Sequence, residues 1–360
     1  MLLRMRIQPS CRPAWCWTRE SLIAGGMCLA LALGASCAHA STHDPVRLFS
    51  VAYLGDLPTL IALDEGSFQR QGLDVVFERR QSGKQTIQAL RAGETDIALM
   101  APTPLVLDLL ETPHTGGAED PLVIASLVYS SRLNHVVALR RHDIRTPTDL
   151  ADKRVGLMAG TNAEFLWWLF TALHRIDPEE VRVIDLPASS LPQALLEGDI
   201  DAAVLWEPWT SRVETMLPQD GLTFLPGSNI YTENWILVAS RGVLQRRPET
   251  IQRLLSAYQQ AIDAIDADPK GALATYAESI ELDTLHALHD DDLPLFGLSL
   301  DWSLLASLQQ LVQWAEDTGK PITEPQPGIL SWIDARPLQT LLPAAVSLPM
   351  GAAPPEVSSP

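Results

Sequence analysis

The feature that most constrains the fold is a regular alternation of strand-like and helix-like segments between residues 48 and 100. Short apolar runs alternate with stretches of helical spacing, in the order 48–53, 58–63, 72–77, 85–91 and 95–100. Glycine or polar turn residues separate them. Strands that alternate with helices in this way predict a parallel sheet covered by helices.

The same rhythm returns later in the chain. Residues 89–98 read ALRAGETDIA and residues 194–203 read ALLEGDIDAA. In each copy a glycine, Gly93 or Gly198, ends a helical segment, an acidic turn follows, and an apolar strand continues. Two similar α/β lobes that face each other across a cleft are therefore expected.

Residues 1–40 are predicted to be a signal peptide. Four arginines precede or flank the apolar run 22–33, which is too short to anchor the chain in a bilayer, and Ala38-His39-Ala40 suits signal peptidase. Cleavage after Ala40 would give a soluble periplasmic protein. Lipid attachment at Cys37 is the alternative, although no large aliphatic residue stands three places before it.

Composition excludes several function classes. The net charge is −18, and a strongly acidic surface repels nucleic acid and anionic lipid. All four cysteines lie within the first 40 residues, so the remaining chain can form no disulfide and has no thiolate for catalysis or metal binding. We expect no cofactor and no nucleic-acid partner.

The domain boundaries follow from this rhythm. Residues 41–130 together with 238–342 are expected to form lobe 1, which is discontinuous in sequence, and residues 131–237 to form lobe 2. Helical segments dominate after residue 248 and would pack on the sheet of lobe 1. The last residues, 343–360, are rich in proline, alanine and serine and are predicted to be disordered.

Lobe 2 offers two candidate ligand sites. Gly160-Thr161-Asn162 stands between a strand and a helix, where free N–H groups and the helix dipole favour an anion; ordinary capping of the helix by Thr161 or Asn162 is the competing interpretation. Trp206-Glu207-Pro208-Trp209 follows another strand, at the edge where open α/β sheets bind ligands. Trp206 could stack on a ligand, and Glu207 could accept a hydrogen bond from an amine or close the cleft.

Lobe 1 offers three strand ends with small polar groups. A plain helix cap is the alternative function for each of them, but their shared position at one sheet edge predicts at least one ligand contact. The candidates are Leu54, Asp56, Ser82, Gly83, Pro102 and Thr103.

A metal site is not expected. His286 and His289 have the spacing of one helix face and precede Asp290-Asp291-Asp292, but a solvated acidic loop explains them better. The chain also lacks the G-x-S-x-G, GK[ST], G-x-G-x-x-G and HExxH motifs of common enzyme classes, so no catalytic residues are assigned.

The order of segments in 48–100 resembles the opening lobe of solute-binding proteins of bacterial ABC importers, in the family that serves nitrate, sulfonate, taurine, bicarbonate and thiamine-pyrimidine-precursor uptake. The tryptophan–acid–proline sequence at 206–208 recurs at this position in that family, and the turn matching Gly160-Thr161 contacts ligand in its sulfonate and nitrate members. The resemblance extends to about residue 335. It implies the type II periplasmic-binding-protein fold: two lobes, each a mixed, mainly parallel sheet flanked by helices, with the ligand cleft between them.

The resemblance also implies a function. We expect a monomeric, non-enzymatic binding protein that captures a small organic anion or zwitterion and delivers it to an ABC permease and its ATPase. The alternatives are a protein that binds a thiamine pyrimidine precursor, a related enzyme on the same fold, and a sensory module that presents ligand to a receptor. The pyrimidine-precursor synthases of this fold carry a cysteine-rich motif that the chain lacks after residue 40.

Overall fold

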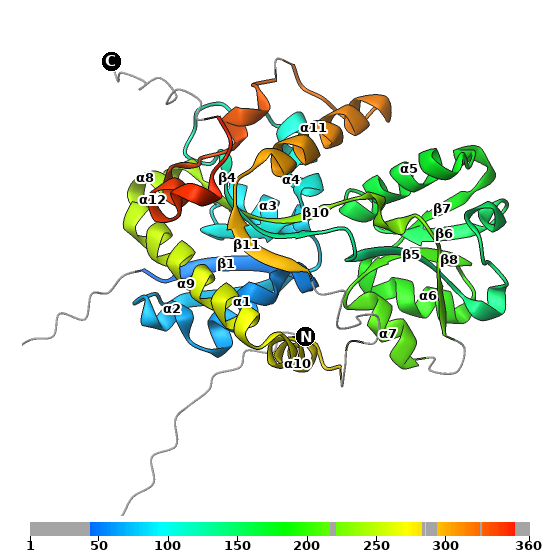
Figure 1. The fold of residues 1–360 in the computed structure, drawn as a ribbon. Helices are drawn as coiled ribbons and strands as arrows, with labels where there is room; N and C mark the ends of the chain where they lie inside the picture. The colour runs from blue at the N-terminus through cyan, green and yellow to red at the C-terminus, as the bar shows by residue number, and fades with distance from the viewer. Residues whose placement is uncertain (1–43, 217–220, 283–284, 286–293, 325, 350–360) are drawn as a thin grey trace, which may run out of the picture. The chain divides into compact units, whose positions relative to one another are not determined.

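A computed structural model describes residues 44–216, 221–282, 285, 294–324 and 326–349 (Figure 1). The structure contains two mixed sheets flanked by helices, as the α/β rhythm of the sequence predicts. The predicted signal peptide and the His286 to Asp292 segment lie outside the described residues.

The first sheet has the strand order β11-β4-β10-β3-β1-β2. Strand β1 runs parallel to β2 and β3, whereas β10 is antiparallel to both β3 and β4, and β11 is antiparallel to β4. The strand bounds are β1 Val46–Val51, β2 Val75–Arg80, β3 Ile97–Met100, β4 Pro121–Ser130, β10 Glu233–Ser240 and β11 Leu295–Ser299.

The second sheet has the order β7-β6-β8-β5-β9. Strand β6 runs parallel to β7 and β8, and β5 is antiparallel to β8 and β9. The strand bounds are β5 Asn134–Leu139, β6 Arg154–Leu157, β7 Arg182–Asp185, β8 Ala202–Trp206 and β9 Leu222–Phe224.

Both sheets are mixed, as predicted, but the expectation that parallel pairs dominate is wrong. Parallel neighbours make up two of the five strand pairs in the first sheet and two of the four in the second. The cause is the route of the chain, which leaves the first sheet after β4 and returns to it in β10. The returning strand enters between β3 and β4 and runs against both.

Helices follow most strands, and the two glycines end helices as predicted. Gly93 and Gly198 adopt left-handed φ angles of 68° and 76° just after α3 and α6. The helix bounds are α1 Leu57–Asp64, α2 Ser67–Arg70, α3 Gly83–Arg91, α4 Pro102–Glu111, α5 Asn162–His174, α6 Leu191–Glu197, α7 Trp209–Met216, α8 Arg241–Arg246, α9 Pro248–Ala267, α10 Pro269–Ser279, α11 Trp302–Asp317 and α12 Arg336–Leu341.

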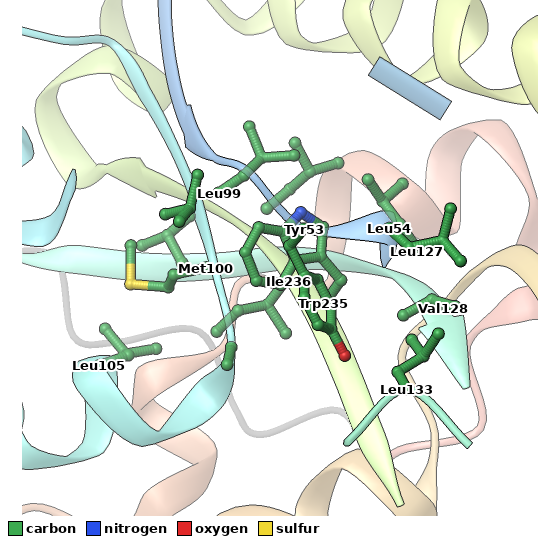
Figure 2. Close-up of a cluster of buried hydrophobic side chains, with 14 of the residues drawn as sticks. Tyr53, Leu54, Leu99, Met100, Leu105, Leu127, Val128, Leu133, Trp235 and Ile236 are labelled. Atoms are coloured by element: carbon green, nitrogen blue, oxygen red, sulfur yellow. The ribbon is translucent and has the colours of Figure 1, made fainter. Parts of the chain in front are cut away.

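The helices pack in two groups around the first sheet. Helices α1, α2, α10 and α12 contact α9, and α3 and α11 contact α4. Strands β3 and β8 are buried along their whole length, which explains why they read as unbroken apolar runs. Figure 2 shows part of the core, where Tyr53 packs on Trp235 with ring centroids 4.6 Å apart.

The segment after α12 differs from its prediction as a disordered tail. Pro343–Ala345 form a 3₁₀ turn, Leu348 is buried, and Val346 pairs with Leu300 through a β-bridge. This proline-rich stretch is ordered because Leu348 is buried and Val346 pairs with Leu300. Amino-acid composition alone does not predict such contacts. Residues 350–360 lie outside the described part. The sequence pattern does not predict strand β11, which pairs with β4 in the first sheet.

Within the described residues, no helix has both the length and the apolar character needed to cross a bilayer.

Gly156 in β6 is closely packed against Leu191 of α6 and Ile200, and this packing gives a first prediction. A Cβ atom on Gly156 would lie 2.5 Å from Ile200 Cδ1 and 2.8 Å from Leu191 Cδ2, both fully buried. Gly156→Ala should therefore lower the free energy of unfolding by about 1–3 kcal/mol, the usual cost of overpacking. Urea denaturation measures this. The control is Gly297→Ala in β11, where a Cβ meets no described atom within 4 Å; equal losses in both variants would contradict the prediction.

Candidate ligand site

A pocket lies where strand ends of the two sheets meet. It encloses about 330 Å³ of empty space, including its open mouth. None of the residues that line it is charged. They are Val51, Tyr53, Ser82, Gly83, Ala101, Pro104, Met158, Thr161, Asn162, Trp206 and Trp235.

The position of the pocket follows from the topology. The carboxyl ends of β1, β2 and β3 contribute residues from the first sheet, and those of β6 and β8 contribute residues from the second. Parallel strands deliver their carboxyl ends to one edge, which is the usual ligand edge of an open α/β sheet. The returning strand β10 adds Trp235.

Three helices begin at the pocket wall. Ser82 caps α3, with its side chain accepting a hydrogen bond from the Gln85 amide, and Thr161 caps α5 by accepting from Ala163. Helix α4 begins after Ala101. Each helix start directs the positive end of a dipole toward the pocket. These helix starts are the available sources of positive potential in a wall that contains no lysine or arginine.

Three aromatic side chains line the same pocket. The rings of Tyr53 and Trp235 are in contact at a tilt of 33°, and each residue is at most 3% exposed. The Tyr53 hydroxyl and Trp235 Nε1 are buried without a hydrogen-bond partner among the described residues. Trp206 donates from Nε1 to the Ala52 carbonyl across the two sheets at 3.4 Å. The wall therefore presents flat aromatic surface to the pocket.

The pocket wall includes five of the residues predicted from sequence and leaves out the other six. Ser82, Gly83, Thr161, Asn162 and Trp206 line it. The predicted candidates outside the lining are Leu54, Asp56, Pro102, Thr103, Gly160 and Glu207.

Gly160 is adjacent to the pocket, but its amide already has an acceptor. The N–H of Gly160 donates to Glu164 Oε2 at 2.7 Å, and the other oxygen of Glu164 is paired with Lys320. Of the predicted turn Gly160-Thr161-Asn162, only Thr161 and Asn162 therefore remain as candidates for the anion. The Gly160 amide is already bonded to Glu164, which lies in the first turn of α5.

Glu207 caps a helix and does not line the pocket. Its side chain is fully buried and accepts hydrogen bonds from Thr210 and, at 2.7 Å, from Ser211, both at the start of α7. Its backbone carbonyl accepts from the Leu54 amide at 3.3 Å, which joins the two sheets. The polar contact predicted for Glu207 thus exists, but the main chain makes it.

Asp56, Leu54 and Thr103 are also buried behind the wall. Asp56 accepts a hydrogen bond from Thr59 at 2.6 Å, and Thr59 is bonded to Tyr258. Leu54 is part of the core (Figure 2), and Thr103 follows Pro102 in the first turn of α4.

A buried polar network behind the pocket was not predicted. Glu233 Oε2 accepts from Asn134 at 3.0 Å and from Asn162 at 2.6 Å, and Glu233 Oε1 accepts from Tyr231 at 3.0 Å. Asn162 also donates to Asn134 Oδ1 at 2.6 Å. The network connects the starts of β5, α5 and β10, and one member, Asn162, reaches the pocket wall.

The lining residues that sequence reasoning missed stand within a few positions of predicted ones, with one exception. Tyr53 precedes Leu54, and Ala101 and Pro104 flank the predicted pair at the start of α4. Val51 is the last residue of β1, and Met158 directly follows β6. Trp235 has no such neighbour. Every residue of β10 is buried, so no polar–apolar alternation indicates which side chain faces the pocket.

Comparison with known proteins identifies the family. A sequence model described as NMT1/THI5 like matches residues 56–272, more than half of the chain. The chain belongs to the NMT1/THI5-like family.

Relatives of this NMT1/THI5-like protein are mainly binding proteins. A Brucella abortus protein, named as a binding protein without a stated ligand, is 27% identical over 71% of this chain and 78% of its own length. The taurine-binding periplasmic protein of Escherichia coli is 22% identical over 74% of this chain and 81% of its own.

Solved structures share the fold. The periplasmic aliphatic sulphonate binding protein SsuA of Escherichia coli has a TM-score of 0.67 at 17% identity, covering 83% of this chain and 99% of its own. The desulfurization enzyme DSZB has a TM-score of 0.58 at 16% identity, covering 83% and 99%. The two-lobe periplasmic-binding-protein fold predicted for the chain is thereby confirmed, and the same fold also carries an enzyme.

Among the described residues, no group of three or more histidine, aspartate, glutamate or cysteine side chains is arranged to hold a metal ion.

Three buried carboxyl groups have altered acidity. Burial raises the pKa of Glu233 to about 7 despite its hydrogen bonds from Tyr231, Asn134 and Asn162. Burial likewise raises the pKa of Asp56 to about 7 against the hydrogen bond from Thr59, and that of Glu207 to about 7 against those from Thr210 and Ser211.

These shifts predict that stability falls as pH rises through neutrality. Unfolded Asp and Glu titrate near pH 4, so between about pH 4 and pH 7 the folded chain binds more protons, and its stability is lost as the pH increases through that window. The melting temperature should be higher at pH 5 than at pH 8. Glu207→Gln should reduce this difference, whereas Glu249→Gln, at a side chain 88% exposed, should preserve it. A melting temperature that rises from pH 5 to pH 8 would contradict the assignment.

Proposed function

We propose that this protein is the solute-binding component of an ABC importer, and that it captures a small organic anion or zwitterion of the sulfonate, taurine or nitrate class. Taurine and aliphatic sulphonates are named as ligands of its relative and its structural neighbour. The permease and its ATPase would be the partners, and the protein would act in the periplasm as a monomer after removal of residues 1–40.

The observation that carries this proposal is a neutral pocket at which three helices begin. A net charge of −18 opposes the approach of any anion, so an anion site needs a local source of positive potential. The starts of α3, α4 and α5 supply it through N–H groups and dipoles. Helices α3 and α5 contribute more donors, because Pro102 and Pro104 remove two N–H groups from the first turn of α4.

The shape of the wall favours an organic ligand over a bare inorganic ion. Tyr53, Trp206 and Trp235 present aromatic surface that a carbon chain or ring can cover. Binding would bury the solute between lobe 1, residues 41–130 and 238–342, and lobe 2, residues 131–237. Closure would then bend the segments near 129–135 and 233–238.

An enzyme is the second candidate, because the structural neighbour DSZB is a desulfurization enzyme on this fold. The two functions differ in the fate of the ligand. A binding protein returns its sulfonate unchanged, whereas a desulfurization enzyme breaks a carbon–sulfur bond.

A ligand panel tests the proposal. Taurine, propane-1-sulfonate, nitrate and a thiamine pyrimidine precursor would be screened by melting temperature and calorimetry. A ligand present at about 100 times its Kd should add about 2.7 kcal/mol to the stability. We expect a sulfonate to bind and to be recovered intact after long incubation. Release of sulfite or another product, detected by mass spectrometry, would favour the enzyme.

Substitution at Thr161 tests the location of the anion. Thr161→Asp keeps a good helix cap on α5 but adds a carboxylate to the pocket wall, so it should weaken sulfonate binding about tenfold to a hundredfold. Thr161→Asn has a similar shape without charge and should weaken binding less. Calorimetry at constant pH, with helicity checked by circular dichroism, measures both. Equal affinities in the two variants would move the anion away from α5.

A further inference from the structure

The side chain of Asn162 has only one kind of polar atom left for a ligand. Its side-chain nitrogen donates both hydrogens, one to Asn134 Oδ1 at 2.6 Å and one to Glu233 Oε2 at 2.6 Å. The carbonyl oxygen Oδ1 is the polar atom that remains, and Asn162 lines the pocket. In this orientation the side chain can accept a hydrogen bond from a ligand but cannot donate one.

Glu233 determines this orientation. An ionised carboxylate only accepts hydrogen bonds, so the group that faces it must be a donor. Asn134 donates to one Glu233 oxygen at 3.0 Å and Tyr231 donates to the other at 3.0 Å. The inward atom of the Asn162 amide lies 2.6 Å from a Glu233 oxygen, where a carbonyl oxygen would be repelled, so that atom must be the nitrogen. Glu233 and Asn134 are at most 3% exposed, so water does not compete for these positions.

We propose that Glu233 is a positioning residue that locks the Asn162 amide with its oxygen toward the pocket, and that the site thereby selects ligands carrying an N–H or O–H donor beside their anionic group. This inference rests on the proposed function for the anionic part of the ligand. It adds the requirement for a donor at the Asn162 end. Ligands that end in a methyl group or in an acceptor would leave Asn162 Oδ1 without a partner or facing another oxygen.

Three sulfonates that differ at one end provide the test. Taurine ends in an ammonium donor, propane-1-sulfonate in a methyl group of similar size, and sulfoacetate in an acceptor carboxylate. Calorimetry at pH 8, above the pKa of about 7 of Glu233, keeps that carboxylate ionised. The wild-type protein should bind taurine about tenfold more tightly than propane-1-sulfonate, and sulfoacetate least, because a buried polar group left unpaired costs roughly that factor.

Variants separate positioning from simple packing. Asn162→Leu, similar in shape but without polar atoms, should bring the ratio of taurine to propane-1-sulfonate affinity close to one. Glu233→Leu should do the same, because Asn134 then loses the carboxylate that orients it, so both amides can turn over together and Asn162 can point its nitrogen outward. Glu233→Gln should retain most of the ratio, since its amide oxygen can accept from Asn134 and Asn162 while Tyr231 accepts from its nitrogen. A folded Asn162→Leu or Glu233→Leu variant that keeps the full ratio overturns the inference.

A measurement on the wild-type protein without ligand tests the positioning function even if the chosen sulfonates do not bind or a variant does not fold. In the wild-type protein the side-chain amide hydrogens of Asn162 should exchange slowly with solvent in nuclear magnetic resonance spectra. Rapid exchange of both hydrogens overturns the positioning function whatever the ligand. Slow exchange together with binding of none of the sulfonates supports the positioning and overturns the proposed function, whereas equal binding of taurine and propane-1-sulfonate overturns only the selectivity.

Discussion

The arrangement of the pocket depends on the hydrogen bonds that the buried carboxylate of Glu233 accepts. An unpaired buried charge is strongly destabilising, so a carboxylate that is 0% exposed must be surrounded by donors. Asn134, Asn162 and Tyr231 supply them from the start of β5, the start of α5 and the segment before β10. The two sheets are thus tied together at the point where the chain passes between them.

The acidity of the whole chain explains why the pocket wall is built from main chain and neutral side chains. A lysine or arginine in the wall would find many acidic partners on a surface of this charge, whereas a helix start cannot be neutralised by a change of rotamer. A helix amide can nevertheless be occupied by a carboxylate of the same helix. Glu164 accepts a hydrogen bond from the Gly160 amide and is paired with Lys320. The amides beyond it, at Thr161 and Asn162, lie in the pocket wall.

Sequence reasoning was most successful for features with a local signal. The alternation in residues 48–100, the glycine turns after α3 and α6, and the predominance of helix after residue 248 all depend on short-range patterns, and the structure confirms them. Turns at the strand ends were located as well, but not every residue predicted there lines the pocket. Tyr53 lines it next to the predicted Leu54, and Gly160 stands outside the lining although its predicted neighbours line it. A one-residue shift at a turn reverses the direction of a side chain, and composition does not fix that shift. The Glu233 network could not be predicted, because its members are separated by up to 99 positions in sequence.

The position of β10 also has a consequence for the order in which the chain can fold. The second sheet uses only strands β5 to β9, which are contiguous in sequence, whereas the first sheet has a gap between β3 and β4 that only β10 fills. Until the chain beyond the second sheet has emerged, the edges of β3 and β4 lack their partner, and unpaired strand edges are prone to wrong association. The second sheet can therefore form early and locally. The first sheet, with its distant strand pairings, cannot be complete before β10 and β11 are available.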